Sequence, residues 1–451
     1  GGGGGGGDDD DDAFAFDSSA RRMLEESSGT DTHIALYLII PFMSAIVGYA
    51  TNIVALQMTF YPLEFFPSFL KFAQVPGQPF GLLGGWQGII PSKAGKMAGI
   101  LTDLMTTKLI DVAEMFGRIV PHDFAEVLAP AVKASTYTIF SDIMNAEAPF
   151  VWKSLPNAVQ QDIVLEVMGG VPEFLEGLTQ DLIENIYEVL DIKSMTVGLA
   201  EANKALVVKM FREVGDKEFV IIERSGGYFG FIFGVFQMII FYIVDVYEPE
   251  YSGPLLPVFG FMVGWLTNWV ALKLIFRPIE PTPVCCGAFV IQGAFLKRQE
   301  AVSEKFAALN AELFCNAHNI WDEMMHGAKK EQFNAMIKKH ATTFFDRTVG
   351  GSGAMVAKTL FGKETFERVR GGVADGLVKQ LPSILPISYD YQDEVLLIED
   401  TVREAMRVLP PAEFEGVLHP VFEEDEIKLI FVGGVLGALV GLAQYTLIFA
   451  S

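Results

Sequence analysis

The stretch that decides the fold is residues 255–276, LLPVFGFMVGWLTNWVALKLIF. Its one formal charge, Lys273, lies near its end. A helix needs roughly 20 predominantly apolar residues to cross the hydrocarbon core of a bilayer. The stretch therefore predicts a membrane-spanning helix.

Three further segments share this length and this scarcity of charge. Of the 451 residues in the chain, 51% are hydrophobic and 20% are charged, and the mean hydropathy is +0.34. An average soluble domain has about 25% charged residues, so the composition also favours a membrane protein. The alternative is four buried helices in a large soluble core, where runs this poor in charge are rare. The three segments are 34–58 (IALYLIIPFMSAIVGYATNIVALQM), 226–243 (GGYFGFIFGVFQMIIFYI) and 429–450 (LIFVGGVLGALVGLAQYTLIFA).

The four predicted spans place two long regions, 61–224 and 277–427, on one side of the membrane. The link at 246–253 forms a tight hairpin on the other side, where both termini also lie. Basic residues flank the spans on the side of the long regions, whereas the hairpin tip carries only acids. Because lysine and arginine favour the cytosolic side, we expect both long regions in the cytosol or its organellar equivalent. The basic residues are Lys71, Lys93, Lys96, Lys217, Arg224, Arg277, Lys297, Arg298 and Lys428.

Charge and cysteine content limit the partners of the chain. Residues 1–33 begin GGGGGGGDDDDD and are predicted to be a disordered acidic tail. The net charge of −23 argues against a nucleic-acid partner. Three cysteines exclude a disulfide scaffold. The expected partners are the lipid bilayer, a second copy of the chain, and proteins that bind the helical regions.

The second half of the chain repeats the first, at an offset of 216 residues around the first and third spans. The offset is 205 residues for Gln87-Gly88 and Gln292-Gly293, and 207 residues for the glycine series of the second and fourth spans. Around the first span, the residues Pro41, Gly48, Thr51, Asn52, Ala55, Leu56, Phe60, Pro62 and Glu64 correspond to Pro257, Gly264, Thr267, Asn268, Ala271, Leu272, Phe276, Pro278 and Glu280.

We therefore predict an all-α integral membrane protein with four transmembrane helices in two tandem repeats. Each repeat has an even number of spans, so the two repeats are parallel and related by an axis along the membrane normal. Repeat 1 is predicted at 34–245, with spans at about 34–60 and 225–245 around the helical region 61–224. Repeat 2 is predicted at 254–451, with spans at about 254–276 and 428–450 around the helical region 277–427.

Small residues recur at every fourth position in all four spans. Residues four apart lie on one helix face, and small residues on such a face let two backbones approach closely in lipid. We therefore expect one bundle packed through these faces. The packing residues are Ser44, Gly48, Gly226, Gly230, Gly234, Gly260, Gly264, Gly433, Gly437 and Gly441.

Polar side chains lie on or near the same faces. A buried amide in lipid must be hydrogen-bonded or hydrated. Two interpretations stay open: hydrogen bonds between helices, worth about 1 kcal/mol each, or a polar site between the repeats. The candidate site consists of Thr51, Asn52, Gln237, Thr267, Asn268 and Gln444.

Proline ends the first and third spans, at Pro62 and Pro278. The stretch 65–91, rich in proline, glycine and aromatic residues, is predicted to be an interfacial loop, with a re-entrant segment as the alternative. Arg277 and Glu280 are placed to pair at the interface. Farther on, apolar residues at helical spacing predict helices with one buried face. These include Met97, Leu101 and Met105 in the first half and Val302, Phe306 and Leu309 in the second.

No group of residues in the sequence is typical of a catalytic site. Cys315 with His318, and Glu323 with His326, have the spacing of metal ligands. A di-iron bundle requires two E-x-x-H pairs, and Glu114, at the corresponding place in the first half, has no histidine after it. The acidic cluster at 423–426 is interpreted as a solvated face. We therefore expect no enzymatic activity, no metal and no cofactor.

The motifs of the second half resemble those of the YheB-like integral membrane proteins, the family named domain of unknown function 445. That family carries TN-x-x-A-[IL]-K-M-[IL]-F-R-P at a membrane helix, then G-x-x-P-K-R, then a helix with GG-x-x-G-x-x-x-G-x-x-Q. The first half departs more, with Gln57 for the lysine and Tyr61 for the arginine, although Pro91 keeps the proline. The resemblance covers both halves and implies a membrane location without a particular activity. The matching residues are Asn268, Ala271, Lys273, Phe276, Arg277 and Pro278 in the first motif and Lys297 and Arg298 in the second, where Leu296 replaces the proline.

The sequence thus predicts a non-enzymatic protein that organises or tethers a membrane, with its cytosolic-side helical domains as interaction surfaces. The alternative is an oligomeric transporter or channel for a small solute or ion, with its site between Asn52 and Asn268. A polar, hydrated space between these two residues would favour transport. A dry contact packed through glycine would count against it.

Overall fold

The computed structural model describes residues 37–247, 249–284, 289–348, 362–423 and 426–449. Within these ranges the chain is mostly helical, and its main interruptions are a loop after the first span and one short two-stranded hairpin. The prediction of a helical fold is confirmed at this level. The predicted acidic tail at 1–33 lies outside the described residues.

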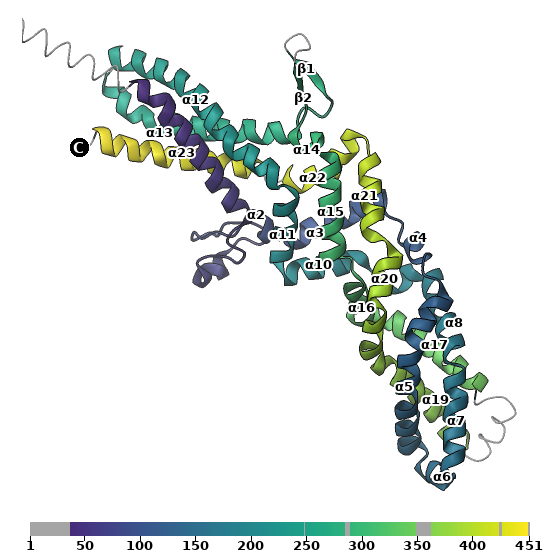
Figure 1. Cartoon of the computed structure of the whole chain (residues 1–451). Helices are drawn as coiled ribbons and strands as arrows, with labels where there is room; N and C mark the ends of the chain where they lie inside the picture. The colour runs from purple at the N-terminus through teal and green to yellow at the C-terminus, as the bar shows by residue number, and fades with distance from the viewer. Residues whose placement is uncertain (1–36, 248, 285–288, 349–361, 424–425, 450–451) are drawn as a thin grey trace, which may run out of the picture.

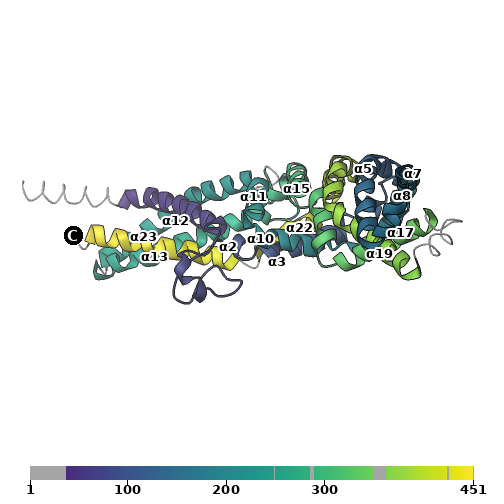
Figure 2. The ribbon, with the colours of Figure 1, turned by 90° about the horizontal axis from the view of Figure 1, so that it is seen from below.

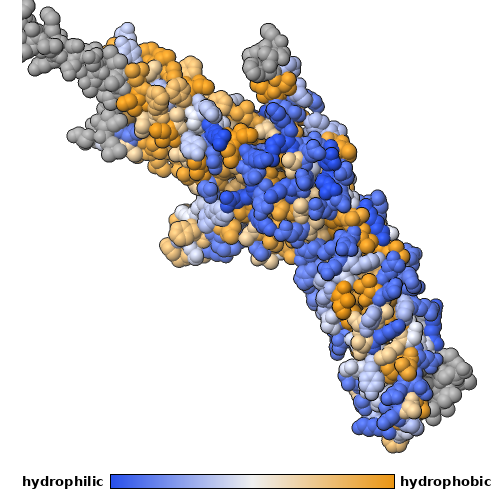
Figure 3. Space-filling model, in the orientation of Figure 1, coloured by the Kyte–Doolittle hydropathy of each residue, from blue (hydrophilic) through white to orange (hydrophobic). Residues whose placement is uncertain are grey.

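Four of the helices are long and apolar enough to cross a membrane, as the sequence predicts. They lie together at one end of the molecule, where hydrophobic side chains dominate the visible surface (Figures 1 and 3). We call these four helices the membrane bundle. The candidate spans are Tyr37–Phe60, Asp216–Val244 within α12 (Asp216–Tyr247), Gly253–Phe276 within α13 (Pro249–Phe276), and Glu426–Thr446 within α23 (Glu426–Phe449).

Two helix boundaries differ from the prediction. Helix α12 begins at Asp216 instead of 225, because a charged, amphipathic turn continues the helix beyond its apolar part. The link expected at 246–253 is mostly helix, because α12 runs to Tyr247 and α13 begins at Pro249. Proline is well tolerated at the first position of a helix, which suits Pro249 to begin α13.

The other helices extend away from the bundle as an elongated rod (Figures 1 and 2). Its end farthest from the bundle is formed by α5, α6, α7, α8, α17 and α19 (Figure 1). The first half supplies α2 (Ile89–Ser92), α3 (Ala94–Leu104), η2 (Met105–Leu109), α4 (Val112–Phe116), α5 (Pro121–Glu147), α6 (Pro149–Ser154), α7 (Asn157–Gly169), α8 (Val171–Glu184), α9 (Ile186–Val189), α10 (Ile192–Ala202) and α11 (Lys204–Val214). The second half supplies α14 (Ala294–Lys297), α15 (Gln299–Leu313), α16 (Ala317–His326), α17 (Lys330–Thr348), α19 (Lys363–Ile384), η3 (Leu385–Ser388), α20 (Tyr389–Leu396), α21 (Ile398–Val408) and α22 (Pro411–Glu423).

Helices of the two halves interleave along the rod. Helix α11 of the first half packs on α15 of the second, and α22 of the second half packs on α3 of the first. Farther out, α5 contacts both α8 and α19, and α17 contacts both α19 and α8. The regions 61–224 and 277–427, which the sequence presents as two separate domains, therefore share a main hydrophobic core, and a second buried cluster that is also built from both halves fills the far end of the rod.

Aromatic contacts illustrate this shared core. The rings of Phe124 and Trp321 stack with centroids 6.2 Å apart, and those of Phe174 and Phe344 lie 5.5 Å apart. The predicted buried helix faces are confirmed in both halves. Their members Met97, Leu101, Met105, Val302, Phe306 and Leu309 are all buried.

A loop follows the first span and a β-hairpin follows the third, on opposite flanks of the bundle in the view of Figure 1. The hairpin pairs β1 (Thr282–Val284) antiparallel with β2 (Phe289–Ile291), with Thr282 opposite Ile291. The loop contains the 3-10 helix η1 (Ser68–Ala73).

The loop is ordered around a buried ring and exposes several apolar side chains. The Phe65 ring fills its interior, and a Cβ atom at Gly81 would lie 2.9 Å from that ring. Residues three apart eclipse one another in a 3-10 helix, so Phe69 and Phe72 of η1 lie on one face. The exposed fractions are 67% for Phe66, 75% for Phe69, 79% for Phe72, 83% for Leu82 and 64% for Leu83.

Candidate site at the base of the membrane bundle

The first and second spans meet along a seam of small residues. A Cβ atom at Gly48 would overlap the Gly226 carbonyl oxygen, and one at Gly230 would overlap the Ser44 carbonyl oxygen. At Gly234 a Cβ atom would lie 2.6 Å from Pro41 Cα. The backbones are therefore in direct contact, which only glycine permits at these positions.

The third and fourth spans meet along a corresponding seam. A Cβ atom at Gly260 would overlap the Gly437 carbonyl oxygen, and one at Gly264 would overlap the Gly433 carbonyl oxygen. Gly441 lies against the Leu256 carbonyl group. The small residues thus form two separate seams, each joining one pair of helices, and do not form a single contact among all four.

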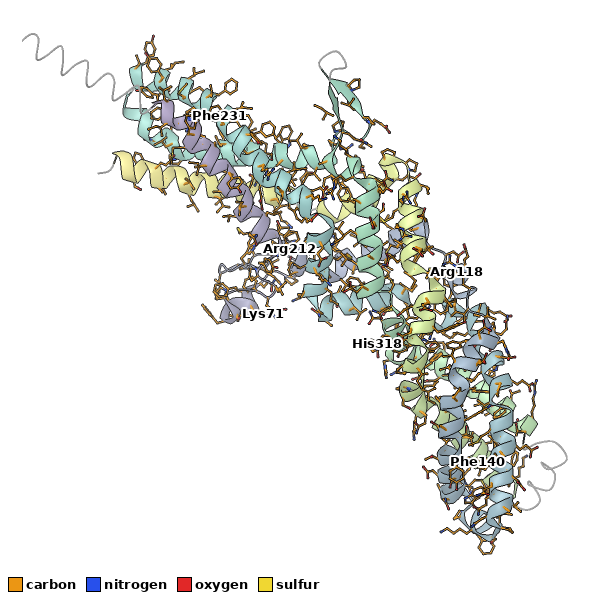
Figure 4. All side chains as sticks on the ribbon, in the orientation of Figure 1. Lys71, Arg118, Phe140, Arg212, Phe231 and His318 are labelled. Atoms are coloured by element: carbon orange, nitrogen blue, oxygen red, sulfur yellow. The ribbon has the colours of Figure 1, made fainter. Side chains whose placement is uncertain are left out.

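The two pairs meet through apolar side chains and through contact between α12 and α13. Phe241, Leu256 and Phe259 form a buried cluster against Tyr37 and Tyr445, so all four spans contribute to it. Phe231 lies on the outer side of the first pair, where its ring meets Phe42 edge to face at 5.4 Å (Figure 4).

Each predicted asparagine donates a hydrogen bond across its own seam. Asn52 Nδ2 donates to the Ile222 carbonyl oxygen at 2.7 Å, and Asn268 Nδ2 donates to the Leu429 carbonyl oxygen at 2.9 Å. Each acceptor lies one helical turn before the first glycine of its seam, Gly226 or Gly433. The same contact therefore occurs at the same place in both pairs.

The other predicted polar residues lie apart from this space. Thr51 and Thr267 bond to carbonyl groups of their own helices, at 3.1 Å to Gly48 and 3.2 Å to Gly264. Gln237 accepts a hydrogen bond from Ser44 Oγ at 2.9 Å. That bond lies about 22 Å along α12 from Ile222.

Gln444 lies 207 residues after Gln237, where the predicted repeat pairs the two, and it is half-buried on α23. Gly260 stands where the first half has Ser44, so the second pair has no hydroxyl group to donate at that position. Of the six polar residues predicted for one site, the structure brings only Asn52 and Asn268 to a common space.

That space is a cavity of about 60 Å³ between the two helix pairs, at the end of the bundle nearest the rod. All four spans contribute to its wall, together with α11 and α14. The lining is almost entirely apolar. It consists of Asn52, Ala55, Leu56, Thr59, Phe211, Val214, Gly215, Glu218, Phe219, Ile222, Asn268, Leu272, Ile275, Phe276, Phe295 and Leu429.

Aromatic and cationic side chains close the base of the bundle beside this cavity. Arg212 lies at the junction with the rod (Figure 4), where its Nη1 donates to the Tyr61 hydroxyl at 2.7 Å. Its guanidinium also lies 5.9 Å from the centroid of the Phe60 ring. At the third span, the His419 ring packs on Phe276 with centroids 4.7 Å apart.

Two buried oxygen atoms at the cavity have no hydrogen-bond partner among the described residues. They are Asn52 Oδ1 and Glu218 Oε2. The Asn52 residue is 0% exposed and Glu218 is 1% exposed. The other carboxylate oxygen of Glu218 accepts a hydrogen bond from Arg298 Nη1 at 2.6 Å, which joins α12 of the first half to the second half.

Three of the four basic residues in the family-like motifs form ion pairs. Arg298 pairs with Glu218, and Lys273 lies 3.3 Å from Glu426. Arg277 lies 3.6 Å from Glu415, and the expected pairing with Glu280 is wrong. The fourth basic residue, Lys297, is exposed on α14.

The acids in these pairs were missed by sequence reasoning. Glu218 lies in the charged turn that precedes the apolar part of α12, where hydropathy shows only the edge of a span. Glu426 belongs to the acidic cluster interpreted as a solvated face, but its side chain is only 20% exposed and faces Lys273. The available signal was an acid just before a span, opposite a basic residue at the end of another span.

The residues with metal-ligand spacing have other contacts. The His318 ring lies 5.7 Å from Tyr389, and His326 Nδ1 lies 2.9 Å from Asp322. Burial raises the pKa of the Cys315 thiol to about 11. Within the ranges that the structure describes, no three His, Cys, Asp or Glu side chains are grouped as a metal site requires.

Comparison with protein-family models, with curated proteins and with solved structures finds no match to this chain. The resemblance to the YheB-like membrane proteins is therefore carried by the sequence motifs alone and stays a prediction.

Proposed function

We propose that this chain is a non-enzymatic membrane scaffold, which anchors an interleaved helical rod to a bilayer and presents the rod's far end to a second surface. The four apolar helices fit the anchor.

The observation that carries the proposal is the core shared by the two halves. Helices from both halves alternate along the rod, and the main core is joined to the second buried cluster at the far end through Phe344 and Leu377. Closely packed protein interiors transmit displacement with little compression. A rod built in this way holds its tip at a fixed distance from the membrane, which is what a tether or scaffold requires.

The tight packing of the bundle weighs against the transport alternative. Both asparagine amides are engaged with backbone carbonyl groups, and both seams are in backbone contact. The space between the pairs is small and its walls are nearly all apolar. An ion or polar solute crossing there would lose its hydration without replacement, at a cost of several kcal/mol.

The tip of the rod supplies a contact surface. Helix α6 lies at the end farthest from the bundle (Figure 1), and its Phe150 is 85% exposed. Leu165 on α7 is 63% exposed, and Tyr137 on α5 is 50% exposed. Large exposed apolar side chains on the outer helices suit an interaction surface, and we assign the contact to α6 and α7 at the tip.

The loop after the first span extends the proposed membrane anchor. Between residues 65 and 92 the only charge is Lys71, and the phenylalanines of η1 point away from the protein. Aromatic side chains favour the interface between lipid and water. We place this loop in the headgroup layer, on the same side of the membrane as the rod, which the distribution of basic residues assigns to the cytosol.

We also propose that the halves arose by duplication of one YheB-like unit. The glycine seams and the asparagine hydrogen bonds each occur once in each half, and the contacts between the halves occur as a matching pair, α11 with α15 and α22 with α3. These matching contacts support the offsets found in the sequence.

Vesicle clustering tests the scaffold. Purified chain is reconstituted into vesicles, labelled and mixed with protein-free vesicles of a second colour, and clustering is followed by light scattering and two-colour co-localisation. We expect the protein to cluster vesicles. The double variant Phe150→Ser/Leu165→Ser should abolish clustering, whereas Tyr187→Ser, a substitution of a rod residue that is 58% exposed, should leave it intact.

The outcomes separate the alternatives. Recruitment of protein-free vesicles identifies a bilayer as the second surface, whereas clustering only among protein-bearing vesicles identifies contact between tips. If the vesicles do not cluster, or if clustering persists in the Phe150→Ser/Leu165→Ser variant, the tether proposal is wrong. Ion or solute flux in the same vesicles, sensitive to Asn52→Leu or Asn268→Leu, would instead establish the transport alternative.

A further inference from the structure

A groove on the outer surface of the first helix pair contains a single arginine. The groove has a volume of about 630 Å³, is open along one side, and lies between the first span and α12. Its lining is mostly apolar and aromatic, and the one charged residue in it is Arg224. The lining consists of Tyr49, Arg224, Gly227, Tyr228, Phe231 and Ile232, of which Phe231 is labelled in Figure 4.

The groove begins where the uncharged part of α12 begins. The 20 residues that follow Arg224, 225–244, carry no formal charge. They extend about 30 Å along the helix, which is the thickness of the hydrocarbon core of a bilayer. Arg224 therefore lies at the boundary between head groups and hydrocarbon, in the leaflet that faces the rod. Tyr228 and Phe231 follow it on the same helix face, so the groove runs from this boundary toward the acyl chains.

The hydrogen-bond donors of the groove are available. Among the described residues, the guanidinium of Arg224 forms no ion pair, and the hydroxyl groups of Tyr49 and Tyr228 form no hydrogen bond. The lining includes no carboxylate that could balance the arginine. A guanidinium group binds phosphate oxygens through two parallel N–H bonds, so this groove is suited to a phosphate.

The basic residues at the exit of the third span are engaged instead. A groove there is lined by Lys273 and Arg277, among others. Lys273 lies 3.3 Å from Glu426, and Arg277 lies 3.6 Å from Glu415. An anionic ligand would have to compete with these acids, which is not the case at Arg224.

The second helix pair has aromatic rings where the first has the arginine. Phe431 lies 207 residues after Arg224, and its ring meets that of Phe261 edge to face with centroids 6.3 Å apart. A Cβ atom at Gly434 would lie 2.8 Å from the Phe261 ring, whereas one at Gly227 would have no neighbour closer than 3.7 Å. The surface beside Gly227 is therefore open, and the one beside Gly434 is covered by a side chain.

We propose that the groove binds a phospholipid with a net negative head, taken from the leaflet that faces the rod. Its phosphate accepts hydrogen bonds from Arg224, and an acyl chain passes Gly227 and lies against Phe231 and Ile232. One negative charge balances the guanidinium, whereas a zwitterionic head would also bring an ammonium group, for which the groove has no carboxylate. The proposal rests on the membrane location of the spans and does not depend on the tether.

Photolabelling with a phospholipid tests the proposal. Full-length protein in micelles of a neutral detergent is labelled with phosphatidylglycerol that carries a diazirine on an acyl chain, and the labelled residues are mapped by mass spectrometry. We expect labelling at Phe231 and Ile232. Unlabelled phosphatidylglycerol should protect these residues about tenfold better than phosphatidylcholine with the same acyl chains.

Two variants and a matched control locate the site. Arg224→Gln should lower the protection by phosphatidylglycerol to the level of phosphatidylcholine. Ala45→Phe gives the first pair the ring that Phe261 supplies 216 residues later, and should remove the labelling although Arg224 is kept. Lys217→Gln removes the same charge from an exposed position of α12 outside the groove and should change nothing. Arg224 is exposed as well, so its variant should fold and decides the outcome if Ala45→Phe does not.

Four results would overturn the proposal. Equal protection by the two lipids would show that the groove does not select a charged head. Equally strong labelling at Leu439 and Leu442, which are exposed on the fourth span, would show general contact with lipid. Equal losses in Arg224→Gln and Lys217→Gln would show attraction to diffuse surface charge. Displacement of the probe by glycerol 3-phosphate in solution would assign the site to a soluble phosphate.

Discussion

The two helix pairs of the bundle agree at their seams and differ at their edges. Both have glycine at the points of backbone contact and an asparagine that donates across the seam. Only the first pair has the hydrogen bond from Ser44 to Gln237, and only the second has the ion pair of Lys273 with Glu426. The close approach of two backbones thus sets a strict requirement, whereas contacts at the edges of the pair can be made in several ways.

The segments that follow the first and third spans also combine matched backbone contacts with parts that differ between the halves. Gly88 N donates to the Pro62 carbonyl oxygen at 2.9 Å, and Gly293 N donates to the Pro278 carbonyl oxygen at 2.9 Å. Gln87 and Gln292 then bond to carbonyl groups one residue farther along, at 2.7 and 3.1 Å. Between these matched bonds, one half has an apolar loop and the other a β-hairpin.

The largest effect should come from separating the halves. We expect residues 1–247 and 248–451, produced as two chains, to co-purify and to elute together as one species. Neither chain alone should give a monodisperse monomer, because each would expose core residues such as Phe124 or Trp321. Size-exclusion chromatography in detergent, with a tag on one chain, measures this. A stable monomer of either half would mean that the halves have independent cores.

Alanine at the seams should cost the next largest amount. For Gly48→Ala and Gly264→Ala we expect a similar loss, of about 1–3 kcal/mol each, because the added methyl group meets a backbone carbonyl oxygen. Reversible unfolding in detergent micelles measures the loss. Gly227→Ala is the control, since its nearest neighbour would lie at an ordinary 3.7 Å. Unequal losses of stability in the two variants would show that the two seams are not packed equally closely.

Removal of the asparagines should cost less and should distinguish the pairs. Each of Asn52→Leu and Asn268→Leu loses one hydrogen bond across a seam, worth about 1 kcal/mol. Asn52→Leu also removes an unpartnered buried oxygen, so we expect the smaller loss there. The same unfolding measurement ranks the two variants. A larger loss at Asn52 would mean that its Oδ1 has a hydrogen-bond partner under these conditions.

An ion pair between the halves should make the rod sensitive to acid. Asp181 on α8 accepts hydrogen bonds from His340 at 2.7 Å and from Lys339 at 3.0 Å, both on α17. Burial alone would raise the pKa of Asp181, but these two partners outweigh it and hold the pKa below the usual 3.8. The stabilisation is therefore complete above the usual value and is lost as the pH falls through the lowered pKa.

The unfolding temperature at a series of pH values tests this sign. The difference between wild type and Asp181→Asn should be largest above pH 5 and should close as the pH falls below 3.8. Glu173→Gln disrupts an exposed pair with Arg347 on the same two helices and should change little. A difference between wild type and Asp181→Asn that persists in strong acid would show that packing, and not charge, explains the effect.

The smallest effect should come from the hydrogen bond that only the first pair has. We expect Ser44→Ala to cost about 0.5–1 kcal/mol, because Gln237 loses one donor in the apolar part of the seam. Gly260→Ser, which would add the missing hydroxyl to the second pair, should instead destabilise it, since its Cβ atom would overlap the Gly437 carbonyl oxygen. A stabilising Gly260→Ser variant would show that the second seam is wider than described.

Hydropathy and spacing predicted the elements of this fold but not how distant elements meet. The apolar length of each span and the four-residue spacing of its small residues are local properties, so Gly48 and Gly264 could be identified without a structure. The pairing of Glu218 with Arg298 depends on where α12 and α14 lie in space, and no local pattern encodes it. The interleaving of α11 with α15 was missed for the same reason, because residues far apart in sequence form it.

The interleaved core has a consequence for any protein that carries only one copy of this unit. Each half of the chain contributes helices to the core of the rod, so under the proposed duplication a single-copy protein would complete its fold by exchanging helices with an identical partner. If the duplication proposed here holds, the present chain is a homodimer whose subunits have become one gene product. Once the two subunits are linked in one chain, their sequences can diverge. One could then acquire the apolar loop at 61–88 while the other kept a hairpin at the same exit from the membrane.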